Sequence, residues 1–546
     1  MEPRGDTTEG CSVRSPSEKA PGAAPAPPVA EADLTGSSRL TRNVLSSWSG
    51  HLVFLAAGFV LPRMIDRHVG QEALGVWDFG WSVVAYFMLA LGGIISSVNR
   101  YVAKHRAAGD MEALRQFVSS VTLVLVIVSL LLTAVTATLV LVLPSLMGGT
   151  LAGHVTEARW VVAFLGLSVA VQVAASGYSG VLTGCHRWDL HNGVNAGAYA
   201  LAVVGMIIAL TCGGGLRELA FLNLCGELVG RVARGVLATR VCPGLQVRLR
   251  YVRWACVREA LTFGSKSFLP QLGEVLLRQT VAILVLTHLG PASLAAYSRP
   301  TSLVRHVRTL VQKLAMVLTP TAGSLKAASG QEKLRDLLIK STRYAVYLAL
   351  PATLTLMIFG GPILRLWMGP RYEHGLLLAL LAGGYLATIL LRPAQNILIG
   401  MNAHGRPGAA SLLAAGVAVG LAYVALGPLD MGLVGAALAV GIPLTLVDGV
   451  YVPLLACRRL GLGVGSFVVQ VLREPLVCIV PYTACLLAAR LALWQRPLLG
   501  LGCGLAVGSA VLAPLYWRYA LPPSLKKSIS SRLGRGRKDA ALESAS

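Results

Sequence analysis

Charged residues are scarce in this sequence. Asp, Glu, Lys and Arg make up 13% of its 546 residues and hydrophobic residues 55%, whereas soluble domains carry about 25% charged residues. A chain with so few charges cannot surround a water-soluble core with a polar surface. The shortage excludes a soluble globular protein and predicts an all-α polytopic membrane protein.

Acidic residues are the scarcer of the two charged classes. The chain has 25 acidic and 48 basic residues, which gives a formal net charge of +23. Such an excess can indicate nucleic-acid binding. In a membrane protein it more simply indicates cytoplasmic loops that follow the positive-inside rule. We therefore expect membrane lipids, and not nucleic acid, among the partners.

The sequence also lacks motifs for catalysis or metal binding. Its ten cysteines occur singly, without a CxxC pair or a His-rich cluster, and are interpreted as small core hydrophobes with no disulfide framework or metal site. No GxxxxGK(S/T), HExxH or GxSxG pattern is present. A membrane-embedded glycosyltransferase or polymerase would need convergent carboxylates and usually a large soluble loop, and neither is visible. We expect no enzymatic activity and no cofactor.

Long apolar runs are what the sequence has in abundance. A scan for runs of about 20 residues, the length that spans a bilayer, predicts fourteen transmembrane helices. They lie near residues 44–64, 75–99, 117–147, 158–182, 191–213, 217–241, 260–287, 293–320, 342–368, 375–401, 408–428, 432–456, 474–494 and 498–520.

The loops between these runs alternate in charge. Loops on one side, such as RYVAKHRAAGDMEALRQ, are basic, whereas GGTLAGHVTEA, THLGPAS and GPLDMG on the other side contain no Lys or Arg. The positive-inside rule then places both termini in the cytoplasm. The Pro-, Ala- and Ser-rich start cannot pack a core and is expected to be a disordered tail, with no cleavable signal peptide after it.

An internal repeat organises the helices. HVGQEALGVW at 68–77 resembles HLGPASLAAY at 288–297, and AAGDMEALRQF at 107–117 resembles AASGQEKLRDL at 327–337. Both matches are displaced by 220 residues. This common displacement predicts two tandem six-helix bundles related by a pseudo-two-fold axis along the membrane normal. The expected parts are a disordered cytoplasmic tail over 1–42, lobes over 43–241 and 259–457, a basic cytoplasmic linker over 242–258, two extra helices over 458–521 and a basic cytoplasmic tail over 522–546.

The opening of the first bundle resembles a known family. LPRMIDRHVGQEALGVWDFGWSVV at 61–84 and LGGIISSVNRYVAKHRAAGD at 91–110 are similar to bacterial polysaccharide-transport proteins. These are the O-antigen-type flippases of the multidrug/oligosaccharidyl-lipid/polysaccharide exporter superfamily. The resemblance covers roughly residues 43–520.

The resemblance implies alternating access. The cargo would be an undecaprenyl-diphosphate-linked oligosaccharide, moved from the cytoplasmic to the periplasmic leaflet of the bacterial inner membrane for O-antigen, capsule or exopolysaccharide synthesis. Polysaccharide polymerase and ligase machinery would be the partners. Two relatives are alternatives: a lipid II flippase and a multidrug-type cation antiporter. The antiporters rely on buried carboxylates, whereas this interior is enriched in cations.

One apolar span carries four of these cations. SRPTSLVRHVRTLVQKLAMVLTP at 298–320 contains Arg299, Arg305, Arg308 and Lys313 but no acid. A cation in a bilayer core costs at least ~2.5 kcal/mol, and the first repeat has apolar or small residues at the positions matching Arg305, Arg308 and Lys313. Arg recognises phosphate oxygens through a bidentate fork. The pattern predicts a cationic cavity that binds a lipid diphosphate; ion pairs between helices are the alternative, and a scaffold protein would need no such arginines.

Neighbouring spans complete the candidate site. Lys266 and Arg392 are further expected cations of the cavity, and Arg392 precedes Pro393 at an expected bend. Four acids lie within spans and are candidates for coupling transport to protons or sodium: Asp78, Asp448, Glu227 and Glu274. The last two are spaced i, i+4 from Arg231 and Arg278 and are expected to pair with them. Asp78 and Asp448 are therefore the preferred coupling residues.

Overall fold

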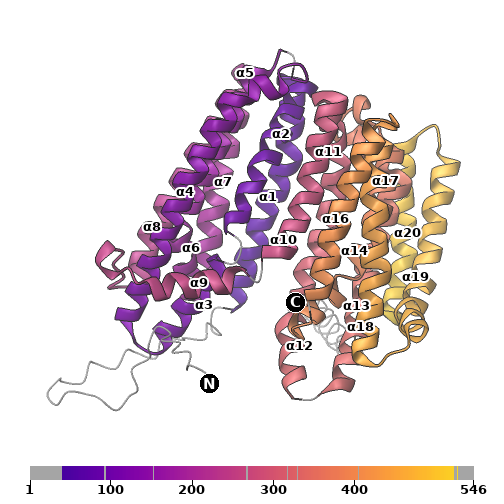
Figure 1. Ribbon diagram of the computed structural model, residues 1–546. Coiled ribbons are helices and arrows are strands. Elements are labelled where there is room, and N and C mark those ends of the chain that lie inside the picture. The colour runs from indigo at the N-terminus through magenta and orange to yellow at the C-terminus, as the bar shows by residue number, and fades with distance from the viewer. Residues whose placement is uncertain are drawn as a thin grey trace, which may run out of the picture. The chain divides into compact units, whose positions relative to one another are not determined.

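The computed structural model describes residues 40–91, 94–151, 153–265, 268–316, 318–328, 330–403, 405–521 and 526 (Figure 1). Its regular structure in these ranges is entirely helical, so the all-α prediction is confirmed. Eleven segments of the described chain are long and apolar enough to cross a membrane, which confirms a polytopic protein. The count of fourteen spans stays a prediction, and the two terminal tails lie almost wholly outside the described residues.

The chain divides into two compact units, Met1–Ala295 and Ala296–Ser546, so the division falls inside one helix, α11. The lobe boundaries expected from the repeat remain a prediction. The helices that begin in unit 1 are α1 (Leu40–His68), α2 (Gln71–Phe87), η2 (Met88–Leu91), α3 (Ile94–Ala107), α4 (Met111–Met147), α5 (Val155–Ala174), α6 (Ser176–Gly184), α7 (Trp188–Thr211), α8 (Leu216–Val241), η3 (Leu249–Tyr251), α9 (Trp254–Ser265), α10 (Phe268–Val275), η4 (Leu276–Thr280) and α11 (Val281–Ala315).

Unit 2 continues from the second half of α11. Its further helices are α12 (Leu318–Ala327), α13 (Gln331–Met368), η5 (Pro370–Tyr372), α14 (Gly375–Leu390), α15 (Arg392–Gly400), α16 (Gly405–Leu426), α17 (Gly432–Leu444), η6 (Thr445–Tyr451), α18 (Val452–Leu460), α19 (Val464–Ala492) and α20 (Pro497–Tyr519). Here η4 and η6 are π-helical, and η2, η3 and η5 are 3₁₀ turns.

Long helices lie side by side within unit 1. α4 packs on α5, α7 packs on both α1 and α8, and α5 packs on α8 (Figure 1). Small residues permit the closest approaches. A Cβ on Gly75 in α2 would lie 1.9 Å from the carbonyl oxygen of Pro291 in α11, so a larger residue there would force the two helices apart.

The repeat is visible in the helix boundaries. The break between α5 and α6 is at Ala175 and the break between α14 and α15 is at Leu391, 216 positions later. Gly70 precedes α2 with a φ of 109°, and Gly290 interrupts α11 with a φ of 82°, 220 positions later. Both glycines have the positive φ that side chains disfavour. Two copies of one helical pattern are therefore present.

The two extra C-terminal helices, α19 and α20, pack on α13. α13 is kinked at Phe359, whose ring is fully buried. Gly500 and Gly504 of α20 lie against this ring, and a Cβ on either would be 3.5 Å from it. The hydroxyl groups of Thr355 and Tyr482 are 2.8 Å apart and join α13 to α19. The helices α19 and α20 thus cover the kink of α13.

Two cysteines differ from their expected place in the core. Cys212 and Cys503 are exposed, so the interpretation of all ten as core residues was wrong for these two. Cys185 and Cys242, in contrast, are buried just after the ends of α6 and α8. Exposure is decided by which face of a helix meets a neighbour, and single cysteines carry no periodicity that would reveal it.

An ionic contact joins α2 to α5. His154, just before α5, lies 2.7 Å from the carboxylate of Glu157 and 3.1 Å from that of Glu72. The hydrogen bond to Glu157, aided by Glu72, raises the pKa of His154 above its ordinary 6.5. A raised pKa means that protonated His154 stabilises the folded state below about pH 6.5, and that this contribution is lost as the pH rises through the folded-state pKa.

We expect His154→Gln to reduce the pH dependence of the melting temperature between about pH 5.5 and pH 8.5. The lost stability should be below about 1 kcal/mol, because both carboxylates are solvent-accessible. Thermal unfolding in detergent at both pH values measures it. His68→Gln is the control, since His68 bonds to the carbonyl of Met64 on its own helix. Identical pH profiles for wild type and His154→Gln would contradict the assignment.

Candidate functional site

A buried carboxylate lies in the helical core of unit 2. Asp448 is on the π-helical segment η6 and is only 3% exposed. Its carboxylate oxygens accept hydrogen bonds from Thr388 Oγ1 of α14 at 2.6 Å and from Gln395 Nε2 of α15 at 2.8 Å. Two neutral donors from other helices therefore hold this acid in place.

The amide of Gln395 connects this acid to an arginine. Arg392 Nη1 donates to Gln395 Oε1 at 2.8 Å, and Arg392 Nε donates to Gln312 Oε1 of α11. Gln395 thus accepts from the cation and donates to the anion. We call Asp448, Thr388, Gln395, Arg392 and Gln312 the Asp448 network.

Helix irregularities position the network. α14 ends at Leu390, Leu391 has a non-helical ψ of 9°, and Pro393 occupies the first turn of α15. The bend expected at Arg392 is therefore confirmed. Arg392 begins α15, where the helix dipole disfavours a positive charge, so the acceptors of Gln395 and Gln312 and the charge of Asp448 offset that cost. Asp448 lies on a π-helix, a feature frequent at functional sites.

The cations expected to line a cavity occupy different environments. Arg308 is half-buried and close enough to Asp448 to act on its charge, as is Arg392. Arg305 is exposed and donates to Ser302 Oγ at 3.2 Å. Arg299 is buried and Lys313 is half-buried. Lys266 lies outside the described residues. The structure thus supplies an acid near Arg308, as the ion-pair alternative requires, and the cationic cavity stays a prediction.

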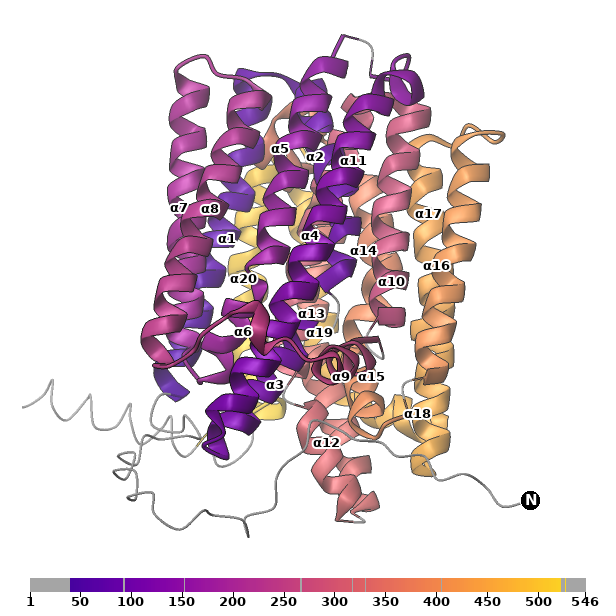
Figure 2. The same ribbon diagram turned by 60° about the vertical axis from the view of Figure 1, so that its left-hand side comes forward.

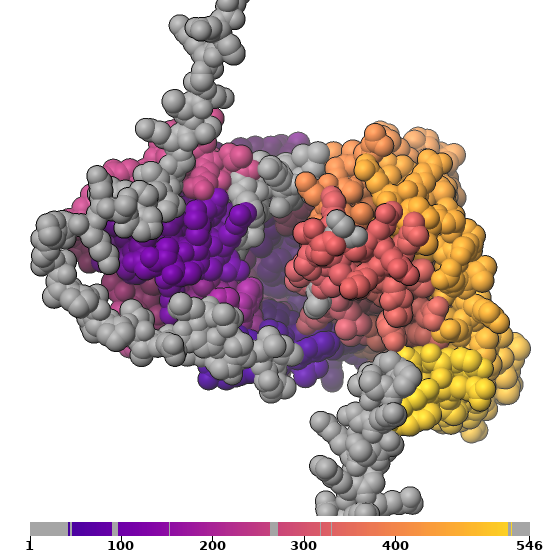
Figure 3. All heavy atoms as spheres, turned by 90° about the horizontal axis from the view of Figure 1, so that it is seen from below, coloured from indigo at the N-terminus to yellow at the C-terminus, as the bar shows by residue number. Residues whose placement is uncertain are grey.

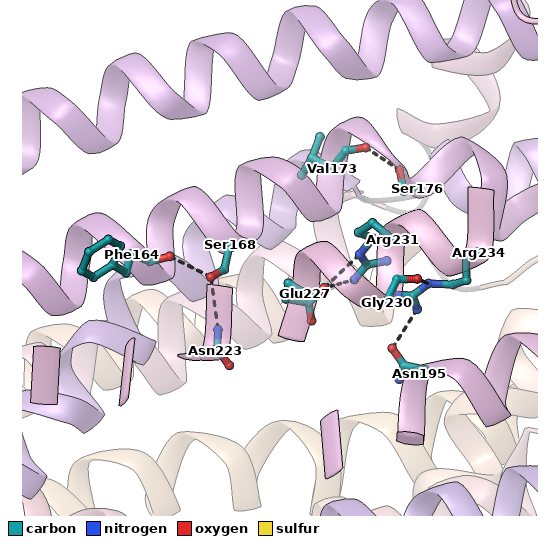
Figure 4. Close-up of polar contacts among 10 residues, drawn as sticks. All are labelled: Phe164, Ser168, Val173, Ser176, Asn195, Asn223, Glu227, Gly230, Arg231 and Arg234. Atoms are coloured by element: carbon teal, nitrogen blue, oxygen red, sulfur yellow. Dashed lines mark hydrogen bonds and ion pairs between the residues drawn. The ribbon is translucent and has the colours of Figure 1, made fainter. Parts of the chain in front are cut away.

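A second polar network lies in unit 1 (Figure 4). On α8, Arg231 Nη2 is 2.6 Å from Glu227 Oε2, so the expected i, i+4 pair is confirmed. Arg234, one turn later, donates to Asn195 Oδ1 of α7 at 2.8 Å and to the carbonyl of Gly230. Both arginines are buried. This network joins α8 to α7 and carries two cations for one acid.

The remaining candidate acids lie elsewhere in unit 1. Glu274 of α10 is 3.3 Å from Arg278, which confirms their expected pairing. Asp78 of α2 is half-buried, and its backbone carbonyl accepts from Ser82 at 3.0 Å. Of the predicted site residues, the structure joins Arg392 and Asp448 in one network and places Arg308 close to Asp448.

The sequence did not identify three residues of these networks. Gln312, Thr388 and Asn195 are uncharged and lie in apolar spans, where a single amide or hydroxyl group gives a weak signal. Gln312 carries the best signal, because it follows Arg308 at i+4 and so lies on the same helix face. A search for amides near intramembrane cations would have found it.

Eleven described segments that can cross a membrane, with ionisable side chains buried among the helices, define a multi-pass membrane protein. A family model for polysaccharide biosynthesis proteins matches residues 73–375, more than half of the chain. The chain therefore belongs to the polysaccharide biosynthesis protein family. The membrane protein EpsK of Bacillus subtilis (strain 168), described as uncharacterized, is 23% identical over 452 residues, covering 82% of this chain and 89% of EpsK.

Solved transporter structures share the fold. An inward-facing multidrug resistance MATE family transporter of the MOP superfamily is similar with a TM-score of 0.65 and 18% identity, covering 76% of this chain and 94% of its own. The lipid II flippase MurJ, in an inward closed conformation, is similar with a TM-score of 0.64 and 12% identity, covering 87% of this chain and 98% of MurJ. At these identities the likeness concerns the fold.

Proposed function

We propose that this protein is a flippase for an undecaprenyl-diphosphate-linked oligosaccharide. It would move the lipid-linked unit from the cytoplasmic to the periplasmic leaflet of the bacterial inner membrane by alternating access, with both termini in the cytoplasm. Membership of the polysaccharide biosynthesis family supports the sugar cargo. The transporter fold shared with a lipid II flippase supports a lipid-linked cargo.

The observation that carries the proposal is the charge pattern of α11. Its unit 2 half contains Arg299, Arg305, Arg308 and Lys313 and no acid. A diphosphate carries roughly two negative charges and offers oxygens that a guanidinium group binds in a fork. Arg305 is exposed and Arg308 is half-buried, so an anion that enters beside α11 can reach the surface of both side chains. The polyprenyl tail would remain in lipid.

The Asp448 network supplies the link between cargo and driving ion. The positive charges of Arg392 and Arg308, both in unit 2, are close enough to interact electrostatically with the carboxylate of Asp448. A diphosphate bound at Arg308 would compete with Asp448 for the same positive charge. Two negative groups near one cation disfavour each other's ionisation. Cargo binding would therefore favour neutralisation of Asp448 by a proton or a sodium ion, and release would favour its ionised state.

The gene deletion tests the cargo. We expect a deletion strain to accumulate an undecaprenyl-diphosphate-linked oligosaccharide in the cytoplasmic leaflet, and mass spectrometry of the extracted lipids identifies the glycan. Purified protein in proteoliposomes should then flip that same lipid. Accumulation of lipid II instead would identify the peptidoglycan precursor as the cargo. Flipping of neither lipid by folded protein would overturn the proposal.

A further inference from the structure

A basic segment connects α8 to α9 in unit 1. We call residues 242–262 the basic strap. Four of its arginines are exposed: Arg248, Arg250, Arg253 and Arg258. Among the described residues, no carboxylate forms an ion pair with any of these four. The strap therefore presents positive charge that the rest of the described chain does not neutralise.

The strap is fastened to α4 by hydrogen bonds to its backbone. Arg115 Nε of α4 donates to the carbonyl of Gly244 at 2.8 Å. Two serines of α4 accept from strap amides: Ser119 Oγ from Arg248 at 3.2 Å, and Ser120 Oγ from Arg253 at 2.8 Å. Long-range bonds of this kind hold the arginine-bearing backbone in one conformation, which reduces the entropy cost of binding a partner.

The α9 part of the strap buries one face and exposes the other. Cys256, Val257 and Ala260 are buried where α9 packs on α3 and α4. In Figure 2, α9 lies beside α3 at the lower end of unit 1, and Figure 3 views that end from below. The opposite face of the strap is thus directed away from the helices of unit 1.

Large apolar side chains share the exposed face with the arginines. Leu249 is 77% exposed and Trp254 is 75% exposed. Trp254, Arg258 and Leu261 are spaced i, i+4 and i+7, which places them on one side of α9. Interleaved arginines, Trp and Leu on one face are typical of segments that lie in the membrane interface, where Trp sits at headgroup level.

We propose that the basic strap binds the headgroups of anionic phospholipids in the leaflet at this end of α4 and α8. The guanidinium groups would contact lipid phosphates. Leu249 and Trp254 would enter the boundary between headgroups and acyl chains. The charge is complementary, because the positive-inside rule places this basic segment on the cytoplasmic side, and the cytoplasmic leaflet is negative and attracts basic segments beside transmembrane helices. This inference does not depend on which cargo the transporter carries.

Fluorescence quenching by brominated lipids tests the proposal on the full chain. The protein is reconstituted in phosphatidylcholine liposomes that contain brominated phosphatidylglycerol or, separately, brominated phosphatidylcholine at the same fraction. Wild-type emission minus that of Trp254→Phe isolates Trp254. We expect the anionic lipid to quench Trp254 more strongly than the neutral lipid does. The difference in quenching between the two lipids should become smaller at high salt. An arginine beside an anionic membrane contributes about five-fold in affinity, so Arg250→Gln/Arg253→Gln/Arg258→Gln should weaken the preference about a hundred-fold.

A triple variant in unit 2 is the matched control. Lys333→Gln/Arg406→Gln/Arg459→Gln also removes three exposed positive charges and should leave the preference unchanged. Size-exclusion chromatography confirms folding of each variant. Equal quenching by the two brominated lipids, or none by either, would overturn the proposal. Stronger displacement by sodium phosphate than by sodium chloride at equal ionic strength would also overturn it, in favour of a site for soluble phosphate.

Discussion

Replacing Arg308 or Arg305 by Gln is expected to lower transport per folded molecule ten- to a hundred-fold. In the proposed binding mode, each change removes one charge-assisted hydrogen bond to the cargo diphosphate, worth about 1.5–3 kcal/mol. About 1.4 kcal/mol corresponds to a factor of ten. Arg→Lys should restore only part of the activity, because an ammonium group cannot form the fork. Transport of the lipid-linked oligosaccharide in proteoliposomes, normalised to folded protein, measures the effect.

Arg343 is the matched control for this experiment. Its guanidinium group is 2.6 Å from Glu474 and also bonds to the carbonyl of Gln470, so it joins α13 to α19. Arg343→Gln should lower thermal stability but leave transport per folded molecule intact. Full activity per folded molecule in both Arg305→Gln and Arg308→Gln would contradict phosphate binding. Lost stability in Arg308→Gln that Asp448→Asn restores would instead indicate a structural ion pair.

Asp448→Asn is expected to abolish the stimulation of transport by a proton or sodium gradient. An amide keeps the shape and can bond to Thr388 and Gln395, but it cannot bind or release the driving ion. Residual transport should follow the cargo gradient alone. Removing the charge also takes away the negative charge that acts on Arg392 beyond the amide of Gln395. We therefore expect a lower melting temperature as well.

Two variants separate coupling from structural damage. Thr388→Val removes a hydrogen bond to Asp448 but keeps the carboxylate, so gradient stimulation should persist. Glu274→Gln neutralises a 39% exposed acid that pairs with Arg278 four residues later, and it should also remain gradient-stimulated. A gradient response of Asp448→Asn equal to that of wild type would remove Asp448 from the coupling mechanism and favour Asp78, the other preferred acid.

The two networks also differ in charge. The unit 1 network contains two buried arginines and one acid, each held by a partner within unit 1. The Asp448 network has its acid and its arginine separated by an amide, since Gln395 lies between them. An acid that meets only neutral donors directly can change its charge with less disruption than one in a direct ion pair. This difference favours Asp448 over Glu227 as the coupling residue.

The sequence by itself determined the class of protein, the helical repeat and the local ion pairs. Hydropathy over about 20 residues reports membrane helices, and i, i+4 spacing reports pairs such as Glu227 with Arg231. Proline constrains its own backbone, so the bend at Pro393 was also predictable. All of these properties depend on residues close together in the chain.

Tertiary structure alone decided how the buried polar groups are satisfied. Thr388 and Gln395 reach Asp448 across 60 and 53 positions of the chain, and the strap meets Ser119 and Ser120 across 129 and 133 positions. The break at Ala175 has no proline to mark it in the sequence. A buried polar group needs a partner, because leaving it without one costs about 1–3 kcal/mol. Which partner it finds depends on helix packing, and no local pattern in the chain encodes that choice.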